Sequence, residues 1–408
     1  MEKITLGLIR EGKVPADKRV PLTPKQCLIV QEKFPFVKIK VQRSEVRSYS
    51  DNQYSDLGIE VVDNLNDCDI ILGVKEVNKE DLLPNKRYMF FSHTIKKQPY
   101  NRELLKTILE RKIQLTDYEV LKDKNNKRII GFGRYAGVVG AYNALMVYGK
   151  KTGAYELKPA NQCENRKEME AELKKVQFPS GMRLVLTGFG RVGHGAREIM
   201  DLVPLTEVSP EEFLNQDFNK AVFTHLDVED YYARRDGGEF VKSDFYANPH
   251  LYESAFGQFA KRSDVYIACH FWSNKSPNIL TNVDLLGADK LKVVADISCD
   301  IAGPIACTIR SSKIADPIYG YDPRTEKEVE WNAEGAIAVM AVDNLPCELP
   351  KDASEDFGNE LIKVVFPVLF GEDPDNIIAR GTETTADGKL TEYFAYLQDY
   401  VDGDKVSH

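Results

Sequence analysis

The chain has 408 residues, which at about 150 residues per domain predicts two domains or three. It carries 54 Lys and Arg against 63 Asp and Glu, and the formal net charge of −9 argues against binding to nucleic acid or to an anionic membrane. Apolar residues make up 43% and charged residues 29%, as in soluble proteins with a full-sized core. No apolar run reaches the ~18 residues that span a bilayer. The N-terminus lacks an apolar signal region, so we expect a cytoplasmic protein.

The first ~135 residues alternate short apolar runs with helical patterns, which is typical of a parallel sheet covered on both faces. Thr23 is a candidate N-cap for the first helix. Strands are predicted at 4–9, 37–41, 69–74, 88–91 and 113–116, and helices at 24–34 and 101–111.

A second alternating unit begins near Met182, after an apolar helix over 137–149 that we expect to be a buried connector. Its strands are predicted at 182–187, 221–223, 265–268 and 292–295, and 334–342 is apolar and rich in small residues. Two helical patterns follow, near 356–369 and 391–400. In the last one, Tyr393, Phe394, Leu397 and Tyr400 are expected to share a face that docks on the first domain.

Residues 188–195 read G-x-G-x-x-G with a further glycine, directly after a predicted strand and before an apolar helix at 196–202. This context is the one that a dinucleotide-binding fingerprint requires. Gly188 would allow the tight turn, Gly190 would let the backbone approach a pyrophosphate, and Gly193 would let helix and strand pack closely. A glycine-rich turn without a ligand is the alternative interpretation.

The fingerprint also needs an acidic residue for the ribose hydroxyls, usually ~20 residues further on. Asp227 follows the predicted strand at 221–223 but lies further away, and the segment 206–220 looks like an insertion that explains the gap. Glu207 is the rival candidate. A carboxylate at this position repels a 2′-phosphate, so Asp227 favours NAD over NADP, unless it is a solvated surface residue.

Basic residues follow two successive strands of the first domain. Lys75 comes after the strand at 69–74 and His93 after the strand at 88–91, so both are expected at the carboxyl edge, where parallel sheets bind ligands. Glu76 and Glu119 are expected to tune the pKa of these basic groups. A solvated lysine and a structural histidine are the alternatives.

The chain resembles the alanine dehydrogenase/transhydrogenase superfamily, and more closely the lysine-forming saccharopine dehydrogenases and the lysine–ketoglutarate reductase domain. The resemblance is ordered and covers nearly the whole chain. It rests on 18–24, 71–75, 90–96 with Gln98, 117–119, Phe132 and Gly133, Ala136 and Gly137, 188–195, 295–300, 342–346, and Leu349 with Pro350.

The resemblance implies an α/β fold with two Rossmann-like doubly wound parallel-sheet domains separated by a cleft. We expect a substrate and catalytic domain over 1–136 and 346–408, and an NAD-binding domain over 137–345. Lys75 would be the base that deprotonates a secondary amine, and His93 the acid/base in hydrolysis of the imine. The substrate would be bound by Arg19, Lys127, Arg128 and Phe132, and the cofactor by Gln98, Gly188, Gly190, Arg191, Gly193, Asp227, Phe271, Ile297, Val342, Asp343, Asn344 and Leu345.

Three departures from the family pattern are visible. Val192 stands where fungal members have a cysteine, so a disulfide to Cys269 is excluded. Phe271 replaces a nucleotide-contacting tyrosine and keeps only the stacking. Asp227 stands where NADP-type relatives carry a basic segment. The seven cysteines form no C-x-x-C pair and no zinc spacing, so we expect no structural disulfide and no metal.

The predicted activity is the NAD-dependent oxidative deamination of saccharopine to lysine and 2-oxoglutarate. Its partners would be these small molecules, without nucleic acid or membrane, in a monomer or small homo-oligomer. An alanine dehydrogenase or another amino-acid or opine dehydrogenase is the first alternative, because Arg19, Lys75 and His93 would suit either. A non-catalytic NAD-sensing module is the second, and it could dispense with Lys75 and His93.

Overall fold

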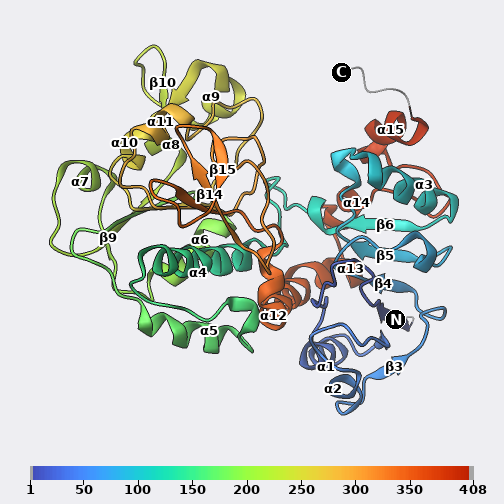
Figure 1. Cartoon of the computed structure of the whole chain (residues 1–408). Coiled ribbons are helices and arrows are strands. Elements are labelled where there is room, and N and C mark those ends of the chain that lie inside the picture. Colours follow the sequence, from blue (N-terminus) through green and yellow to red (C-terminus); the bar gives the residue numbers. More distant parts are fainter. Residues whose placement is uncertain (1–2, 404–408) are drawn as a thin grey trace. The chain divides into compact units, whose positions relative to one another are not determined.

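The computed structural model describes residues 3–403 and divides into two compact units (Figure 1). The first unit is Met1–Phe132 with Pro350–His408, and the second is Gly133–Leu349. From the sequence, the boundaries between the two domains were predicted after residue 136 and before residue 346. Each unit has its own sheet with helices packed on it, so the expected α/β class with parallel-strand sheets is confirmed.

The first unit is built on a six-stranded sheet in which every pairing is parallel, in the order β3-β2-β1-β4-β5-β6. Its strands are β1 (Ile4–Leu8), β2 (Val37–Gln42), β3 (Glu60–Val62), β4 (Ile70–Leu72), β5 (Arg87–Phe90) and β6 (Gln114–Asp117). Its helices are α1 (Pro24–Lys33), α2 (Asp51–Ser55) and α3 (Arg102–Glu110), with α12 (Pro350–Glu360), the π-helix η9 (Leu361–Val365), α13 (Phe366–Phe370), α14 (Ile377–Gly381), the 3₁₀ segment η10 (Glu392–Leu397) and α15 (Gln398–Asp402) from the C-terminal part.

Local signals fix the ends of these elements. Helix α1 starts where predicted, because the Thr23 side chain accepts from the Gln26 N–H while the Gln26 side chain accepts from the Thr23 N–H.

The strand β3 was missed, since Glu60–Val62 is a three-residue edge strand that is only partly buried. The chain order of the sheet reverses between β1 and β4, which creates a switch point at their carboxyl ends.

The C-terminal segment returns to the first unit, as its red elements beside the cyan α3 show in Figure 1. Phe394, Leu397 and Tyr400 are buried together with Leu105 of α3, so the expected docking is confirmed. Tyr393 was wrongly placed on this face and is 44% exposed. The reason is that η10 is a 3₁₀ helix, in which residues three apart share a face and Tyr393 points elsewhere.

The second unit has an eight-stranded sheet in the order β15-β14-β16-β13-β12-β7-β9-β8. Its strands are β7 (Arg183–Thr187), β8 (Thr206–Glu207), β9 (Val222–Leu226), β12 (Val265–Ala268), β13 (Val293–Asp296), β14 (Ile318–Asp322), β15 (Lys327–Val329) and β16 (Ile337–Met340), with a separate hairpin of β10 (Tyr232–Arg234) and β11 (Tyr252–Ser254). Its helices are α4 (Gly133–Thr152), α5 (Arg166–Glu172), α6 (Arg191–Met200), α7 (Pro210–Asn215), α8 (Val228–Tyr231), α9 (Lys242–Ala247), α10 (Gly257–Ala260) and α11 (Asn282–Leu286), and the 3₁₀ segment η8 (Leu345–Glu348) ends the unit.

Strand β14 pairs antiparallel with both β15 and β16, whereas the remaining pairings of this sheet are parallel. The segment 206–220, expected as an insertion, forms the edge strand β8 and the helix α7. Helix α4 is buried along most of its length, as predicted for 137–149. A Cβ on Gly137 would overlap the Val192 carbonyl, and a Cβ on Gly195 would overlap the Arg134 carbonyl, so glycine lets α4 and α6 touch.

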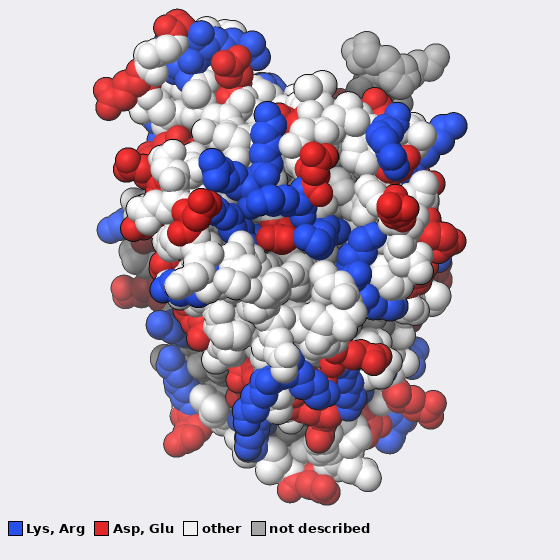
Figure 2. Space-filling model, turned by 60° about the vertical axis from the view of Figure 1, so that its left-hand side comes forward, with Lys and Arg blue, Asp and Glu red and all other residues white. Residues whose placement is uncertain are grey.

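Among residues 3–403, no helix is long and apolar enough to cross a membrane. Both signs of charge are spread over the face shown in Figure 2, and Lys and Arg side chains gather locally there. The net charge of −9 therefore does not describe a uniformly acidic surface.

Candidate active site

The switch point of the first sheet carries Lys75 and the half-buried carboxyl group of Glu11. Glu11 follows β1 and Lys75 follows β4, and Glu11 accepts the backbone N–H groups of Val74 at 2.7 Å and Lys75 at 2.9 Å. Burial, together with the negative charge of Asp17, raises the pKa of Glu11 to about 8 despite these hydrogen bonds. The backbone at Lys75 is thus fixed by a residue whose position at the end of β1 could have marked it from the sequence.

His93 lies three residues beyond β5, the strand next to β4. Its Nδ1 is 2.7 Å from Oε1 of Glu76, and the Nζ of Lys13 is 3.0 Å from Oε2 of the same carboxylate. Burial opposes ionisation of Glu76, but the hydrogen bond and charge of His93 outweigh it and lower the pKa of Glu76 to about 2. An ionised Glu76 orients the imidazole so that Nε2 is the nitrogen left for chemistry.

Arg19 is buried beside the aromatic ring expected in the substrate pocket. Its guanidinium lies 4.2 Å from the centre of the Phe132 ring, and Phe132 stacks on Phe357 at 4.5 Å. Asp17 accepts from Nε and Nη2 of Arg19 at 3.0 and 2.6 Å, and although burial opposes ionisation, Arg19 lowers the pKa of Asp17 to about 2. A substrate carboxylate that binds Arg19 therefore competes with Asp17, a residue that the prediction left out.

Arg128 and Glu119 lie close to each other in the same unit. Nη1 of Arg128 is 4.0 Å from Oε1 of Glu119, and Nζ of Lys96 is 3.4 Å from that oxygen. The Arg128 guanidinium also lies 5.4 Å from the centre of the Phe91 ring. Lys127 is exposed and belongs to a turn held by Asp123. The first unit thus places cations, aromatic rings and acid/base groups beyond the carboxyl ends of its strands. Such a set of side chains can bind an amine that carries several carboxylates.

The glycine loop of the second unit has the local geometry of a phosphate-binding turn. Gly188 has a φ of +96°, and a Cβ on Gly193 would overlap the Gly188 carbonyl, so both positions require glycine. A Cβ on Gly190 would meet no atom within 4 Å. Gly190 is also the N-cap of α6 and has no side chain to cap its first N–H groups. The free space at Gly190 and the uncapped N–H groups at the start of α6 therefore lie at the same place, where a pyrophosphate could be bound. The residues of the loop fit a dinucleotide.

Asp227 is placed next to this loop by the order of the sheet. It follows β9, the neighbour of β7, whereas Glu207 lies in the edge strand β8 and pairs with Arg197 at 2.7 Å. Lys242 Nζ lies 2.9 Å from the Asp227 carboxylate. Burial opposes ionisation of Asp227, but the hydrogen bond from Lys242 outweighs it and lowers the pKa of Asp227. This position favours Asp227 over Glu207, while Lys242 offsets part of its charge.

The remaining predicted cofactor residues of the second unit follow parallel strands of its sheet. Phe271 comes after β12 and is 81% exposed, and Ile297 comes after β13 and packs at Gly140 of α4. The segment 342–345 follows β16. The structure thus brings these residues to one edge, whereas Gln98 belongs to the first unit, where Tyr100 donates to its side chain.

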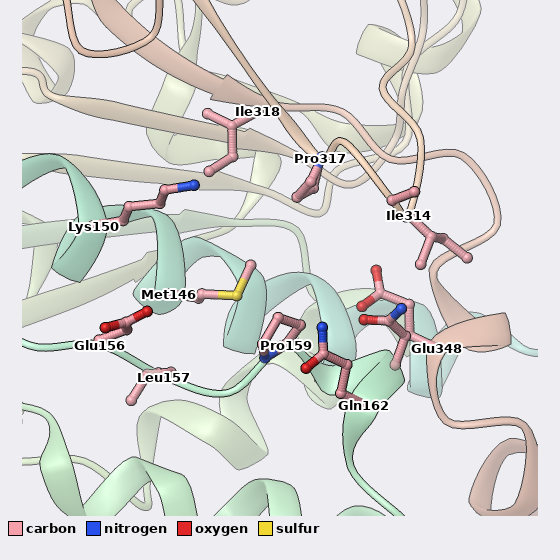
Figure 3. Close-up of a pocket in the computed structure, with 12 residues that line it drawn as sticks. Met146, Lys150, Glu156, Leu157, Pro159, Gln162, Ile314, Pro317, Ile318 and Glu348 are labelled. Atoms are coloured by element: carbon pink, nitrogen blue, oxygen red, sulfur yellow. The ribbon is translucent and has the colours of Figure 1, made fainter.

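A separate cavity of about 250 Å³ lies in the second unit between α4 and the segment that precedes β14 (Figure 3). Met146, Leu157 and Ile314 form part of its apolar wall, and the Glu348 carboxyl group faces it. Burial raises the pKa of Glu348 to about 7, and this carboxyl group accepts from Asn143 Nδ2 at 2.8 Å. The cavity contains none of the predicted site residues.

Residues 7–139 match the model of the N-terminal domain of alanine dehydrogenase/PNT. This part of the chain is therefore similar to that domain. An L-alanine dehydrogenase structure superposes with a TM-score of 0.64 over 98% of this chain and 99% of its own, at 13% identity, and a Sinorhizobium meliloti transhydrogenase with a TM-score of 0.58. At these identities the likeness shows the fold.

Curated relatives extend the similarity to nearly the whole chain. An alpha-aminoadipic semialdehyde synthase of Arabidopsis thaliana is 30% identical over 87% of this chain, and the mouse protein of that name is 28% identical over 97%. The chain spans 37% and 48% of the lengths of these two relatives. A Schizosaccharomyces pombe protein named saccharopine dehydrogenase [NAD(+), L-lysine-forming] is 26% identical over 90% of this chain and 93% of its own.

Proposed function

We propose that this protein oxidises saccharopine with NAD to lysine and 2-oxoglutarate, in a reversible reaction. The observation that carries the proposal is the placement of Lys75 and His93 after the adjacent strands β4 and β5, at the carboxyl edge of the first sheet, with His93 bound to Glu76. The name of the Schizosaccharomyces pombe relative supports the same activity.

Saccharopine is a secondary amine with three carboxylates, and its chemistry sets the order of steps. Bound NAD would supply the hydride acceptor. Hydride leaves the substrate carbon only when the nitrogen lone pair is available, so Lys75 first takes the proton from the ammonium form. His93 then deprotonates the water that adds to the substrate imine and returns the proton as the product amine departs. Arg19 and Arg128 would bind the carboxylates.

Purified protein is expected to reduce NAD with saccharopine and much less with alanine, because a small monocarboxylate leaves one of the two arginines unused. Steady-state kcat/KM for the two substrates, with lysine plus 2-oxoglutarate for the reverse direction, measures the preference. Equal or greater kcat/KM with alanine would assign the chain to the amino-acid dehydrogenases instead. Binding of NAD without turnover of either substrate would identify a sensing module.

Asp227→Ala is expected to narrow the preference for NAD over NADP. The substitution removes a carboxylate that repels a 2′-phosphate and leaves Lys242, now without its 2.9 Å partner, to attract one. The ratio of kcat/KM for the two cofactors should shift toward NADP by about tenfold, the factor that 1.4 kcal/mol produces. Glu207→Ala is the matched control and should leave the ratio unchanged; the opposite pattern would assign the ribose to Glu207.

A cytoplasmic location, a monomer or small homo-oligomer, and the absence of nucleic-acid and membrane partners stay predictions from the sequence. The mouse relative is named as mitochondrial. Cell fractionation would test the location, and light scattering of the purified protein would test the oligomeric state.

A further inference from the structure

Two carboxyl groups are fully buried where β6 ends in the first unit. Asp117 is the last residue of β6, and Glu383 lies on the C-terminal segment, whose Thr382 bridges to Thr116. The N–H of Glu383 donates to the carbonyl of Leu115 at 2.8 Å, which fixes Glu383 beside the strand. We call Asp117 and Glu383 the carboxyl pair.

Two hydroxyl groups connect the members of this pair. Oγ of Ser92 is 2.5 Å from Oδ2 of Asp117, the oxygens of Ser92 and Thr94 are 2.6 Å apart, and Oγ1 of Thr94 is 2.6 Å from Oε2 of Glu383. Three short oxygen–oxygen contacts need three protons, because two oxygens at this distance repel without one. The two hydroxyls supply two protons. The third must come from a carboxyl group of the pair.

The surroundings of the pair also favour a bound proton. Within residues 3–403, the titratable groups that interact most with the pair are Glu119, Tyr118 and Tyr396, and none of these three is a cation. Burial raises the pKa of Asp117, and burial together with Asp117 raises the pKa of Glu383 well above its usual range. Two negative charges cannot share so dry a site without opposite charge.

The hydroxyls that the pair binds belong to the two residues on either side of His93. His93 has a φ of +55°, in the left-handed region that a residue other than glycine adopts only when its surroundings impose it. Ser92 is also tied through its N–H, which donates to Asp117 at 3.1 Å. Both flanks of the strained residue are therefore held by one buried network.

We propose that one proton shared between Asp117 and Glu383 locks the Ser92–His93–Thr94 turn and so positions the imidazole of His93. Asp117 and Glu383 are positioning residues that act through Ser92 and Thr94. The statement about His93 in catalysis rests on the proposed function, whereas the shared proton does not.

The pair links folding to pH. The folded protein holds a proton that the unfolded chain releases at neutral pH, so this stabilisation is complete below the ordinary carboxyl pKa and is lost as the pH rises through the raised pKa of the pair. Unfolding at pH 7 therefore releases a proton from this site. Above the pKa of the pair, two carboxylates would push the turn apart.

Glu383→Gln tests the shared proton. The amide N–H₂ can donate to Thr94, Thr94 to Ser92, and Ser92 to Asp117, so the three contacts keep three protons without a titrating group at Glu383. On unfolding of the full chain by guanidinium in weak buffer at pH 7, the variant should release about one proton fewer than the wild type. Glu392→Gln, an exposed carboxyl group of the same segment, should release as many as the wild type.

The same variants test the positioning role. Glu383→Gln should retain kcat, whereas Glu383→Ala should lower kcat by about 10²-fold, the usual effect of a 1 Å displacement, without raising the Kd of NAD. Equal proton release from wild type and Glu383→Gln, or a Glu383→Gln chain that does not fold, would overturn the shared proton. Wild-type kcat in a folded Glu383→Ala variant would overturn the positioning role. If Glu383→Gln releases one proton fewer than the wild type, but the wild type does not turn over saccharopine, the shared proton is supported and the proposed function is rejected.

Discussion

Lys75→Met is expected to lower kcat for saccharopine oxidation by about 10²-fold or more, the usual size of a lost acid–base group. Methionine fills similar volume but cannot take a proton from the substrate ammonium. The backbone N–H at this position keeps its hydrogen bond to Glu11, so the strand end should stay in place. Steady-state rates at saturating saccharopine and NAD measure the effect.

His93→Gln should lower kcat by a similar factor, because glutamine can still donate to Glu76 but cannot carry a proton between water and product. Lys79→Met is the control: Lys79 is exposed in the neighbouring 3₁₀ turn Lys79–Asp81 and should leave kcat unchanged. Wild-type turnover in Lys75→Met or His93→Gln would refute the corresponding role.

Gly193→Ala is expected to destabilise the second unit and abolish NAD binding. The new Cβ would overlap the backbone carbonyl of Gly188, which cannot rotate away as a side chain could. Overpacking of this kind costs about 3 kcal/mol at the upper end of its usual range. Urea unfolding followed by Trp fluorescence suits the measurement, since both tryptophans, Trp272 and Trp331, lie in this unit.

Gly190→Ala separates nucleotide binding from folding. A Cβ at Gly190 meets no protein atom within 4 Å, so the unfolding midpoint should not move. The methyl group would instead occupy the space into which a pyrophosphate must come, and the Kd of NAD should rise about tenfold or more. An unchanged Kd would show that the phosphates bind elsewhere.

Periodicity and turn chemistry were enough to predict most of the elements. The strand at 183–187, its glycine turn and the capped helix at 24–33 depend on neighbouring residues, so their signals are local. Strand β3 is short and only partly buried, and β14 pairs with β16, which lies further along the chain, so neither feature had a clear local pattern in the sequence. Tyr393 was misplaced because the pattern assumed 3.6 residues per turn where the helix has three.

In the candidate site, too, features set by neighbouring residues were predicted and contacts between distant residues were missed. The positions of Lys75 and His93 after neighbouring strands, and of Asp227 after a strand of the other sheet, follow from the sheet order, because a parallel sheet brings the ends of its strands to one edge. Their roles stay predictions. Asp17 and Lys242 were missed as partners, since ion pairs across loops depend on side-chain positions that no motif encodes. Glu383 was missed for a stronger reason: it meets Ser92 across 291 residues of sequence.

The return of the C-terminal segment to β6 has a consequence for synthesis on the ribosome. When residues 1–132 have emerged, the edge of β6 and the hydroxyls of Ser92 and Thr94 still lack the partners that residues 382–384 provide. The nascent chain must wait for the translation of the entire second unit before its first sheet can close. During that interval the exposed edge of β6 can pair with the wrong strand. A chain that terminates after residue 132 but before residue 382 should therefore aggregate rather than form a smaller folded protein.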